Sequence, residues 1–234
     1  MKFVLTITIS ALILTGCKTI GMYSNNKIEI ITNKERRCFI SNGIPDHPIG
    51  IFPNRGNPNA VEEQNLKGCV PLKPKRGLHP KPVKGIIGIA INGIPFRPNT
   101  AGFWDPNAPQ GHSRQGNKDW SLEIFGALGK LSLDFNNGHV GRGGLYHYHG
   151  IARSLIGTLV GSLVGYAGDG FEIHYLPLEK KSGWELKKGI RPRGGPPGIY
   201  DGSYNEDYKY VGGENRLDQC NGGNIRGKYA YFIT

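Results

Sequence analysis

The sequence GGLYHYHG, residues 143–150, places two tyrosines and two histidines in alternation between glycines. Successive side chains of a β-strand point to opposite faces of its sheet. We therefore expect a strand that carries His147 and His149 on one face and Tyr146 and Tyr148 on the other. Same-face Cβ atoms two residues apart are about 7 Å from each other, so both imidazoles can reach one metal ion. The alternative interpretation is a hydrogen-bonded histidine pair on an aromatic-rich strand.

The composition predicts a protein built mainly from β-strands. The chain has 234 residues, of which 36 are glycine and 16 are proline. Such a content favours loops and short strands over long helices. We expect a mainly β fold with short helices (α+β), arranged as a single globular domain over residues 28–234 with long loops rich in glycine and proline.

The first residues have the features of an export signal. Lys2 gives a basic start, and residues 3–14 form an apolar run that is too short to span a bilayer. The run leads into LTGC, residues 14–17, which resembles the lipobox of bacterial lipoproteins. In a lipobox the cysteine carries the lipid, so we expect lipidation of Cys17.

The lipobox resemblance predicts where the protein lies. Removal of a signal peptide of residues 1–16 leaves Cys17 as the first residue, and residues 17–27 then tether the domain to a membrane surface that it does not span. The residue after Cys17 is not aspartate, which resembles lipoproteins of the Gram-negative outer membrane. We expect an exported protein, anchored by palmitate or a similar acyl chain in the cell envelope and facing the periplasm.

Positive charge is concentrated between Lys67 and Lys84. The chain has a formal net charge of +11, and this segment combines lysines and an arginine with four prolines and no acidic residue. The pattern predicts a polyproline-like surface loop, either simply solvated or in contact with anionic lipid or cell-wall glycan. No nucleic-acid-binding motif accompanies the charge, so we expect no nucleic-acid partner.

The cysteines predict a disulfide. Cys38, Cys69 and Cys220 remain when Cys17 is set aside, and an oxidising compartment favours disulfides. Three is an odd number, so we expect one pair and one free thiol. The sequence leaves open which two residues pair.

Hydrophobic patterns predict further elements. Strands are expected over residues 28–32, 38–40, 85–91, 131–135 and 229–233. A helix capped by Asp119 is expected over residues 120–130. Residues 151–167 predict a packed helix or strand, and residues 166–175 predict a strand around a turn at Asp169-Gly170.

Several motifs together resemble those of the YHYH protein family, which is named after the sequence at residues 146–149. The resemblance runs from about Arg36 to the last residue. The motifs are SNGIPDH (41–47), NPN (57–59), NGIPF (92–96), His139, GYA and DGF within 165–171, YDG (200–202), EDY (206–208) and LDQCNG (217–222). The resemblance itself names no reaction.

Two features depart from the family pattern. Members usually read DGFPIY, whereas this chain has Glu172 in place of the proline and His174 in place of the tyrosine. Members also tend to continue beyond a strand equivalent to residues 229–234. We expect a shortened copy of the family domain, in which the missing tail could have contained a disulfide partner for one of the three cysteines.

Three histidines are the expected metal ligands. His139 lies in the same strand-turn-strand segment as His147 and His149, and we take it as the third ligand. Clustered histidines with carboxylates nearby are typical of transition-metal sites, and imidazole favours zinc or copper over calcium or magnesium.

A second tier of residues could support this site. His47, Asp169 and His174 could ligate the ion directly or orient a ligand imidazole. Asp169 and Glu172 are also candidate catalytic bases.

Three functions fit these features. The first is an envelope lipoprotein that binds a divalent transition metal. The second is a metal-dependent hydrolase or lyase that acts on an envelope substrate through a metal-bound water. The third is a non-catalytic module that binds cell-wall glycan or a protein through Tyr146, Tyr148 and the basic surface.

Overall fold

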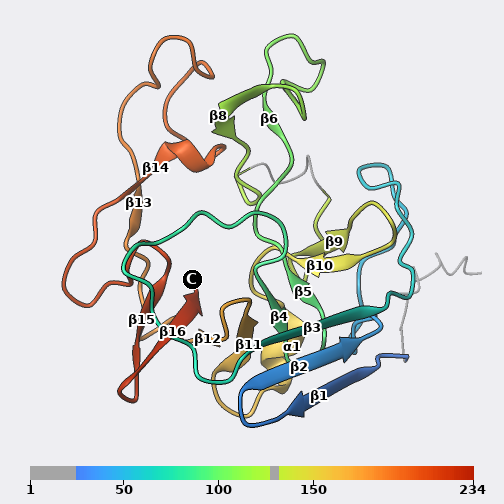
Figure 1. Ribbon diagram of the computed structural model, residues 1–234. Helices are drawn as coiled ribbons and strands as arrows, with labels where there is room; N and C mark the ends of the chain where they lie inside the picture. The colour runs from blue at the N-terminus through green and yellow to red at the C-terminus, as the bar shows by residue number, and fades with distance from the viewer. Residues whose placement is uncertain (1–24, 127–131) are drawn as a thin grey trace, which may run out of the picture.

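Residues 25–126 and 132–234, which the computed structural model describes, are built around an eight-stranded mixed sheet (Figure 1). The mainly β fold predicted from the composition is confirmed. The strand order is β15-β16-β12-β11-β4-β5-β10-β9. These strands are β4 (Gly88–Ala90), β5 (Pro95–Phe96), β9 (Gly138–Val140), β10 (Tyr146–Tyr148), β11 (Leu163–Ala167), β12 (Glu172–Tyr175), β15 (Gly222–Ile225) and β16 (Lys228–Ile233).

Smaller sheets surround the main one. They are β1 (Ile28–Thr32), β2 (Arg36–Ser41) and β3 (Leu66–Pro71); β6 (Phe103–Trp104), β7 (His112–Ser113) and β8 (Asn117–Ser121); and β13 (Trp184–Leu186) with β14 (Tyr208–Tyr210). The helical segments are α1 (Arg153–Thr158) and the 3-10 helix η1 (Asn205–Asp207). In the described part of the chain, no helix has the length and apolar character needed to cross a membrane.

Most predicted strands lie where the hydrophobic pattern placed them. The prediction for residues 28–32 coincides with β1, and those for residues 38–40 and 229–233 fall within β2 and β16. Asp169-Gly170 turns the chain between β11 and β12, as expected. Residues 151–167 contain both alternatives, because α1 precedes β11. The predicted strand at 85–91 shortens to β4.

The predicted helix at residues 120–130 is wrong over its described part. Asp119 and Trp120 lie in β8, which pairs with β6, and no helix follows through residue 126. Trp120 packs edge-on against Tyr204 at 5.8 Å between ring centroids. This tertiary contact and the strand pairing override the helical spacing of the apolar residues. Residues 127–130 lie outside the described residues.

The predicted strand at residues 131–135 is also wrong where it can be compared. Residue 131 is outside the described residues, and residues 132–135 contain no strand. Asp134 instead begins a turn, where one carboxylate oxygen accepts hydrogen bonds from the backbone amides of Asn136 and Gly138 at 2.9 and 3.1 Å. An aspartate that bonds to the amide two residues ahead favours a turn over a strand.

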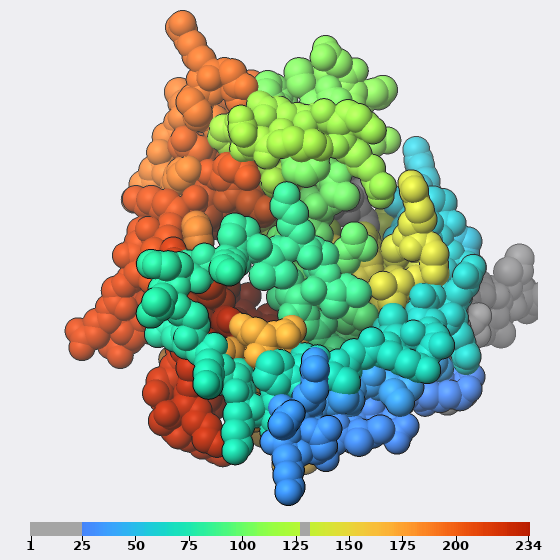
Figure 2. Space-filling view, in the orientation of Figure 1, coloured from blue at the N-terminus to red at the C-terminus, as the bar shows by residue number. Residues whose placement is uncertain are grey.

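The basic segment is part strand and part loop. Lys67 lies in β3, and residues 72–87 then cross the molecular surface without regular structure (Figure 2). Arg76 attaches this loop to the far side of the main sheet: its guanidinium lies 2.9 Å from the Asp218 carboxylate and 4.6 Å from the Tyr229 ring centroid. The predicted surface loop therefore begins after Pro71.

The core lies on one face of the main sheet. Tyr146 and Tyr148 of β10 are completely buried there. Val164 of β11, Leu155 of α1 and Ile94, which directly precedes β5, pack into the same cluster. The strand formed by the YHYH sequence, β10, therefore supplies two of the central residues of the core.

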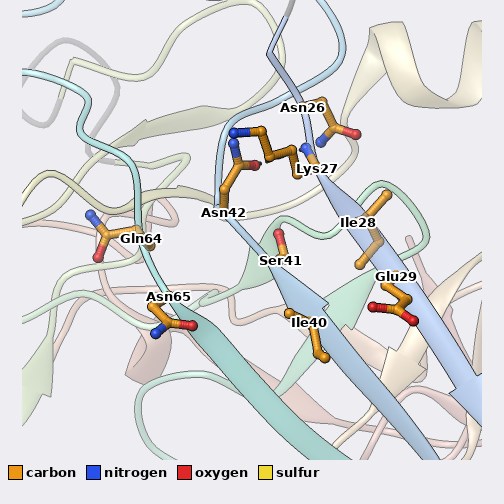
Figure 3. A pocket seen from close by; sticks show the side chains of 9 residues that line it. All are labelled: Asn26, Lys27, Ile28, Glu29, Ile40, Ser41, Asn42, Gln64 and Asn65. Atoms are coloured by element: carbon orange, nitrogen blue, oxygen red, sulfur yellow. Dashed lines mark hydrogen bonds between the residues drawn. The ribbon is translucent and has the colours of Figure 1, made fainter.

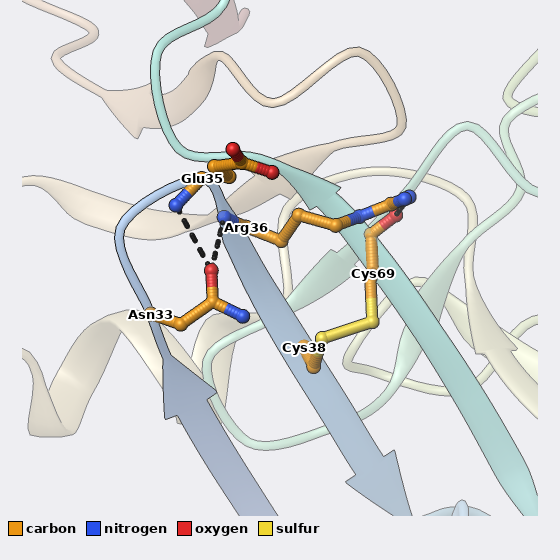
Figure 4. Close-up of a disulfide and its surroundings, with 5 residues drawn as sticks. All are labelled: Asn33, Glu35, Arg36, Cys38 and Cys69. Carbon is orange, nitrogen blue, oxygen red and sulfur yellow. Dashed lines mark hydrogen bonds between the residues drawn. A yellow bond between two sulfur atoms is a disulfide. The ribbon is translucent and has the colours of Figure 1, made fainter.

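The open question of cysteine pairing is answered by the β2–β3 hairpin. Cys38 and Cys69 lie opposite each other in register and form a disulfide (Figure 4). Cys220 is an exposed free thiol. One pair and one free cysteine were expected, and the strand register selects the pair.

We predict that Cys38→Ser/Cys69→Ser lowers the free energy of unfolding by about 3 kcal/mol, because the disulfide closes a loop with a sequence separation of 31 residues. Urea denaturation monitored by tryptophan fluorescence measures the change. Cys220→Ser is the matched control and should leave the midpoint unchanged. Equal midpoints for all three proteins would contradict the prediction.

Candidate metal centre

The β9–β10 hairpin decides which side chains meet at the candidate site. The two strands are antiparallel, and His147 lies directly opposite His139. Opposed residues on one face have Cβ atoms about 5 Å apart. Gly143 and Gly144 make the connecting turn with φ values of 81° and 77°, a left-handed backbone that glycine adopts without strain. The hairpin thus brings one histidine from each strand together.

His149 completes a cluster with His139 and His147. The ring centroids form a nearly equilateral triangle, with separations of 4.8 Å, 4.7 Å and 4.8 Å. His147 and His149 are buried, with 2% and 6% of their surface exposed, and His139 is half-buried. Among the described residues, no cysteine or carboxylate joins this group.

Backbone carbonyls orient two of the imidazoles. Nδ1 of His147 lies 3.1 Å from the Leu145 carbonyl oxygen, and Nδ1 of His149 lies 3.3 Å from that of Pro98. A carbonyl oxygen only accepts, so each Nδ1 carries the proton and each Nε2 is left with a lone pair. A metal-binding histidine is usually oriented in this way, by a hydrogen bond from the ring nitrogen that does not bind the metal.

The dimensions of the cluster fit a transition-metal ion. Nε2 of His149 lies 3.1 Å from Nε2 of His139. Two nitrogens bound tetrahedrally to zinc at about 2.05 Å are about 3.3 Å apart. All three candidate ligand atoms lie within 4.8 Å of one another. Side-chain rotations that bring the most distant pair about 1.5 Å closer would give the nitrogen spacing of a zinc site. Without an ion, Nε2 of His139 carries a proton and donates a hydrogen bond to Nε2 of His149.

Burial keeps the imidazoles neutral. Desolvation lowers the pKa of His147 to about 4 and that of His149 to about 3, and repulsion from the neighbouring histidines lowers both further. The positive charge of Arg97 acts in the same direction on both. Neutral imidazole is the form that binds a metal ion, so both rings hold their lone pairs ready well below pH 7.

On the opposite face, Asp134 holds Tyr146. The tyrosine hydroxyl donates to the Asp134 carboxylate at 2.8 Å, and Gly50 N donates to the same oxygen at 3.1 Å. Burial raises the pKa of Tyr146, so its hydroxyl stays protonated. Gly138 is required beside it, because a Cβ atom at that position would lie 2.3 Å from the tyrosine oxygen.

Tyr148 is held by a second polar network. Asn92 Nδ2 donates to its hydroxyl at 2.9 Å, so the hydroxyl proton is directed to Nε2 of His47. Nδ1 of His47 in turn donates to the Pro48 carbonyl at 2.9 Å. Both nitrogens of His47 are therefore committed to positioning Tyr148, and His47 does not lie in the histidine cluster.

The other second-tier residues also lie away from the cluster. Asp169 accepts a hydrogen bond from the Tyr231 hydroxyl at 2.7 Å. His174 lies between Glu172 and Ser162, 2.9 Å from an oxygen of each. β10 is three strand positions from β11, a distance of about 14 Å, and four from β12. The structure therefore brings together His139, His147 and His149 without these groups.

The cavity of about 500 Å³ over β1 and β2 is not part of this site (Figure 3). Amides line it, but those of Asn26, Asn42 and Gln64 already donate to backbone carbonyls. We place the chemistry at the histidine cluster, because donor geometry and not volume identifies a metal site.

Sequence reasoning missed the residues that hold the two tyrosines. Asp134 and Asn136 precede a glycine turn, which signals an Asx-type turn but not a contact with Tyr146. Asn92 precedes Gly93, a pair typical of turns, and this local signal gives no sign of a contact with Tyr148. Their partners are distant in sequence, so local pattern gives no sign of them.

A comparison with protein-family models matches residues 68–234 to the family described as "YHYH protein". The match includes β9, β10 and the whole histidine cluster. Comparison with curated proteins and with solved structures gave no match.

We predict that the metal-free protein loses stability as the pH falls from about 6.5 to about 4. In this range the unfolded chain binds protons on His147 and His149 while the folded chain does not, so protonation favours unfolding. Each imidazole contributes about 1.4 kcal/mol per pH unit. Urea denaturation in the presence of a chelator measures the slope. His147→Gln/His149→Gln should flatten it, and a wild-type protein with no slope would contradict the prediction.

Proposed function

This chain belongs to the YHYH protein family, and we propose that it binds a divalent transition-metal ion through His139, His147 and His149. The observation that supports the proposal is the near-equilateral triangle of three imidazoles on one face of a hairpin. Their neutral state, carbonyl-held orientation and nitrogen spacing all suit such an ion.

The ligand set favours zinc or copper. Imidazole suits both ions, whereas calcium and magnesium prefer carboxylate and carbonyl oxygens. Three protein ligands leave a further position on a tetrahedral ion for water or another ligand. His139 is the half-buried member, so it lies on the side of the cluster nearest solvent.

The structure does not favour the two other functions inferred from the sequence. A hydrolase or lyase that uses Asp169 or Glu172 as base would need them beside the ion, but neither belongs to the histidine cluster, and β4 and β5 lie between β10 and the β11–β12 hairpin that carries them. A glycan-binding surface built on Tyr146 and Tyr148 would need exposed rings, and both are fully buried. Metal binding by the three histidines requires neither a carboxylate base beside the ion nor exposed tyrosine rings.

We also propose that the protein acts at a membrane surface, anchored through lipidated Cys17 in the bacterial cell envelope. The support is the basic and apolar start of the chain and the lipobox-like residues 14–17. Contact of the basic loop over residues 72–87 with anionic lipid or cell-wall glycan would follow from this location.

We predict that protein purified without chelator and loaded with Zn²⁺ or Cu²⁺ retains about one ion per chain, measured by elemental analysis after gel filtration. His147→Ala/His149→Ala should retain less than a tenth of this amount. His139→Ala tests the third ligand with less disturbance of the core, because His139 is half-buried.

Exposed His79 gives the matched control, and His79→Ala should bind as the wild type does. Circular dichroism shows whether each variant is folded. Equal metal content in the wild-type and His139→Ala proteins, or negligible metal in a folded wild type, would contradict the proposal.

We predict that, in a Gram-negative host, the chain incorporates a palmitate analogue and sediments with membranes. Cys17→Ser should abolish both, because the thiol that carries the lipid is lost. The free thiol of Cys220 provides the control, and Cys220→Ser should label normally. Labelling that persists in Cys17→Ser would exclude anchoring at Cys17.

A further inference from the structure

Arg97 shares the histidine face of the main sheet. β5 and β10 are parallel neighbours, with Phe96 opposite Tyr148, and the Phe96 ring packs toward the core against that tyrosine. Arg97 is the next residue, and its backbone N–H donates to the Tyr148 carbonyl at 2.8 Å. Because side chains alternate between faces, Arg97 projects to the same side as His147 and His149.

Arg97 has no carboxylate partner among the described residues. Its side chain is half-buried, so solvent does not fully screen its charge. The surroundings of the cluster are therefore positive even before a metal ion binds.

A bound divalent ion would increase this imbalance. Three neutral imidazoles leave the two positive charges of the ion uncompensated, and the Arg97 guanidinium adds a third. Like charges in a poorly solvated site repel strongly unless an anion lies between them. The described protein residues thus supply three neutral ligands to the ion but no negative charge to balance it.

We propose that the metal site binds a small oxyanion, a carboxylate or phosphate group, with one oxygen on the ion and another on the Arg97 guanidinium. This inference rests on the proposed metal binding by the three histidines. A tetrahedral ion with three protein ligands has one position left for the first oxygen. The planar fork of arginine suits the remaining oxygens of a carboxylate or phosphate.

The strand order supports such a bridge. β10 lies between β9 and β5, so His139 and Arg97 flank the two buried histidines from opposite sides. Neighbouring strands are about 4.8 Å apart, a span that an arginine side chain covers. An anion above β10 can therefore reach both the ion and Arg97.

The test measures coupling between metal and anion in the intact chain. Co²⁺ replaces the native ion, and its visible absorption reports binding and coordination. Titrations are made alone, with inorganic phosphate, or with acetate, each at constant ionic strength. In the wild type we expect phosphate or acetate to raise Co²⁺ affinity at least tenfold and to change the spectrum, and the stronger of the two identifies the oxyanion.

The Arg97→Gln variant should still bind Co²⁺, but the gain in Co²⁺ affinity that the anion causes should be at least tenfold smaller. The Arg97→Lys variant should keep part of that gain. Arg142→Gln, which removes an exposed arginine in the β9–β10 turn, is the matched control and should behave as the wild type.

Two outcomes separate this inference from the metal proposal. If the folded wild type binds no Co²⁺, the metal proposal itself fails. If it binds Co²⁺ with no response to either anion, or if Arg97→Gln responds as the wild type does, the metal site stands and the oxyanion bridge to Arg97 is overturned.

Discussion

The burial of two tyrosine hydroxyls under β10 is the constraint on which the rest of the site depends. Tyr146 and Tyr148 fill the core, and a buried hydroxyl without a partner would cost about 1–3 kcal/mol. Asp134 satisfies the first hydroxyl, and His47 and Asn92 satisfy the second. These bonds fix the strand in position and register. A slip of one residue would turn the tyrosines outward and the histidines into the core.

The histidine cluster is the other side of the same constraint. Once the phenols are fixed inward, the alternation of side chains places His147 of β10 and His149, which directly follows β10, on the opposite face. The hairpin register adds His139. Burial lowers the pKa values of His147 and His149, and repulsion between the clustered rings lowers them further, so both rings stay neutral at pH 7. The core therefore preorganises the donors and keeps them neutral.

Local sequence pattern was sufficient for the strand and for the three histidines, because a period of two and a glycine turn are local features. It was insufficient wherever partners distant in sequence decide the outcome. Trp120 lies in a strand because Tyr204 packs against it, although its neighbours have helical spacing. Arg97 was overlooked because only the parallel pairing of Phe96 with Tyr148 places it on the histidine face. The supporting acid of Tyr146 was missed for the same reason.

The position of β9 at the end of the main sheet gives metal binding a structural consequence. β9 pairs with β10 on one side, and its other side is covered by Asn57 and Asn59, whose amides donate to the Val140 carbonyl. An ion held by His139 and His147 would link the last two strands across their pairing register. Binding free energy would then add directly to the stability of the hairpin, because the ligands converge only when β9 is paired. Metal binding and the pairing of β9 with β10 would then be a single coupled equilibrium.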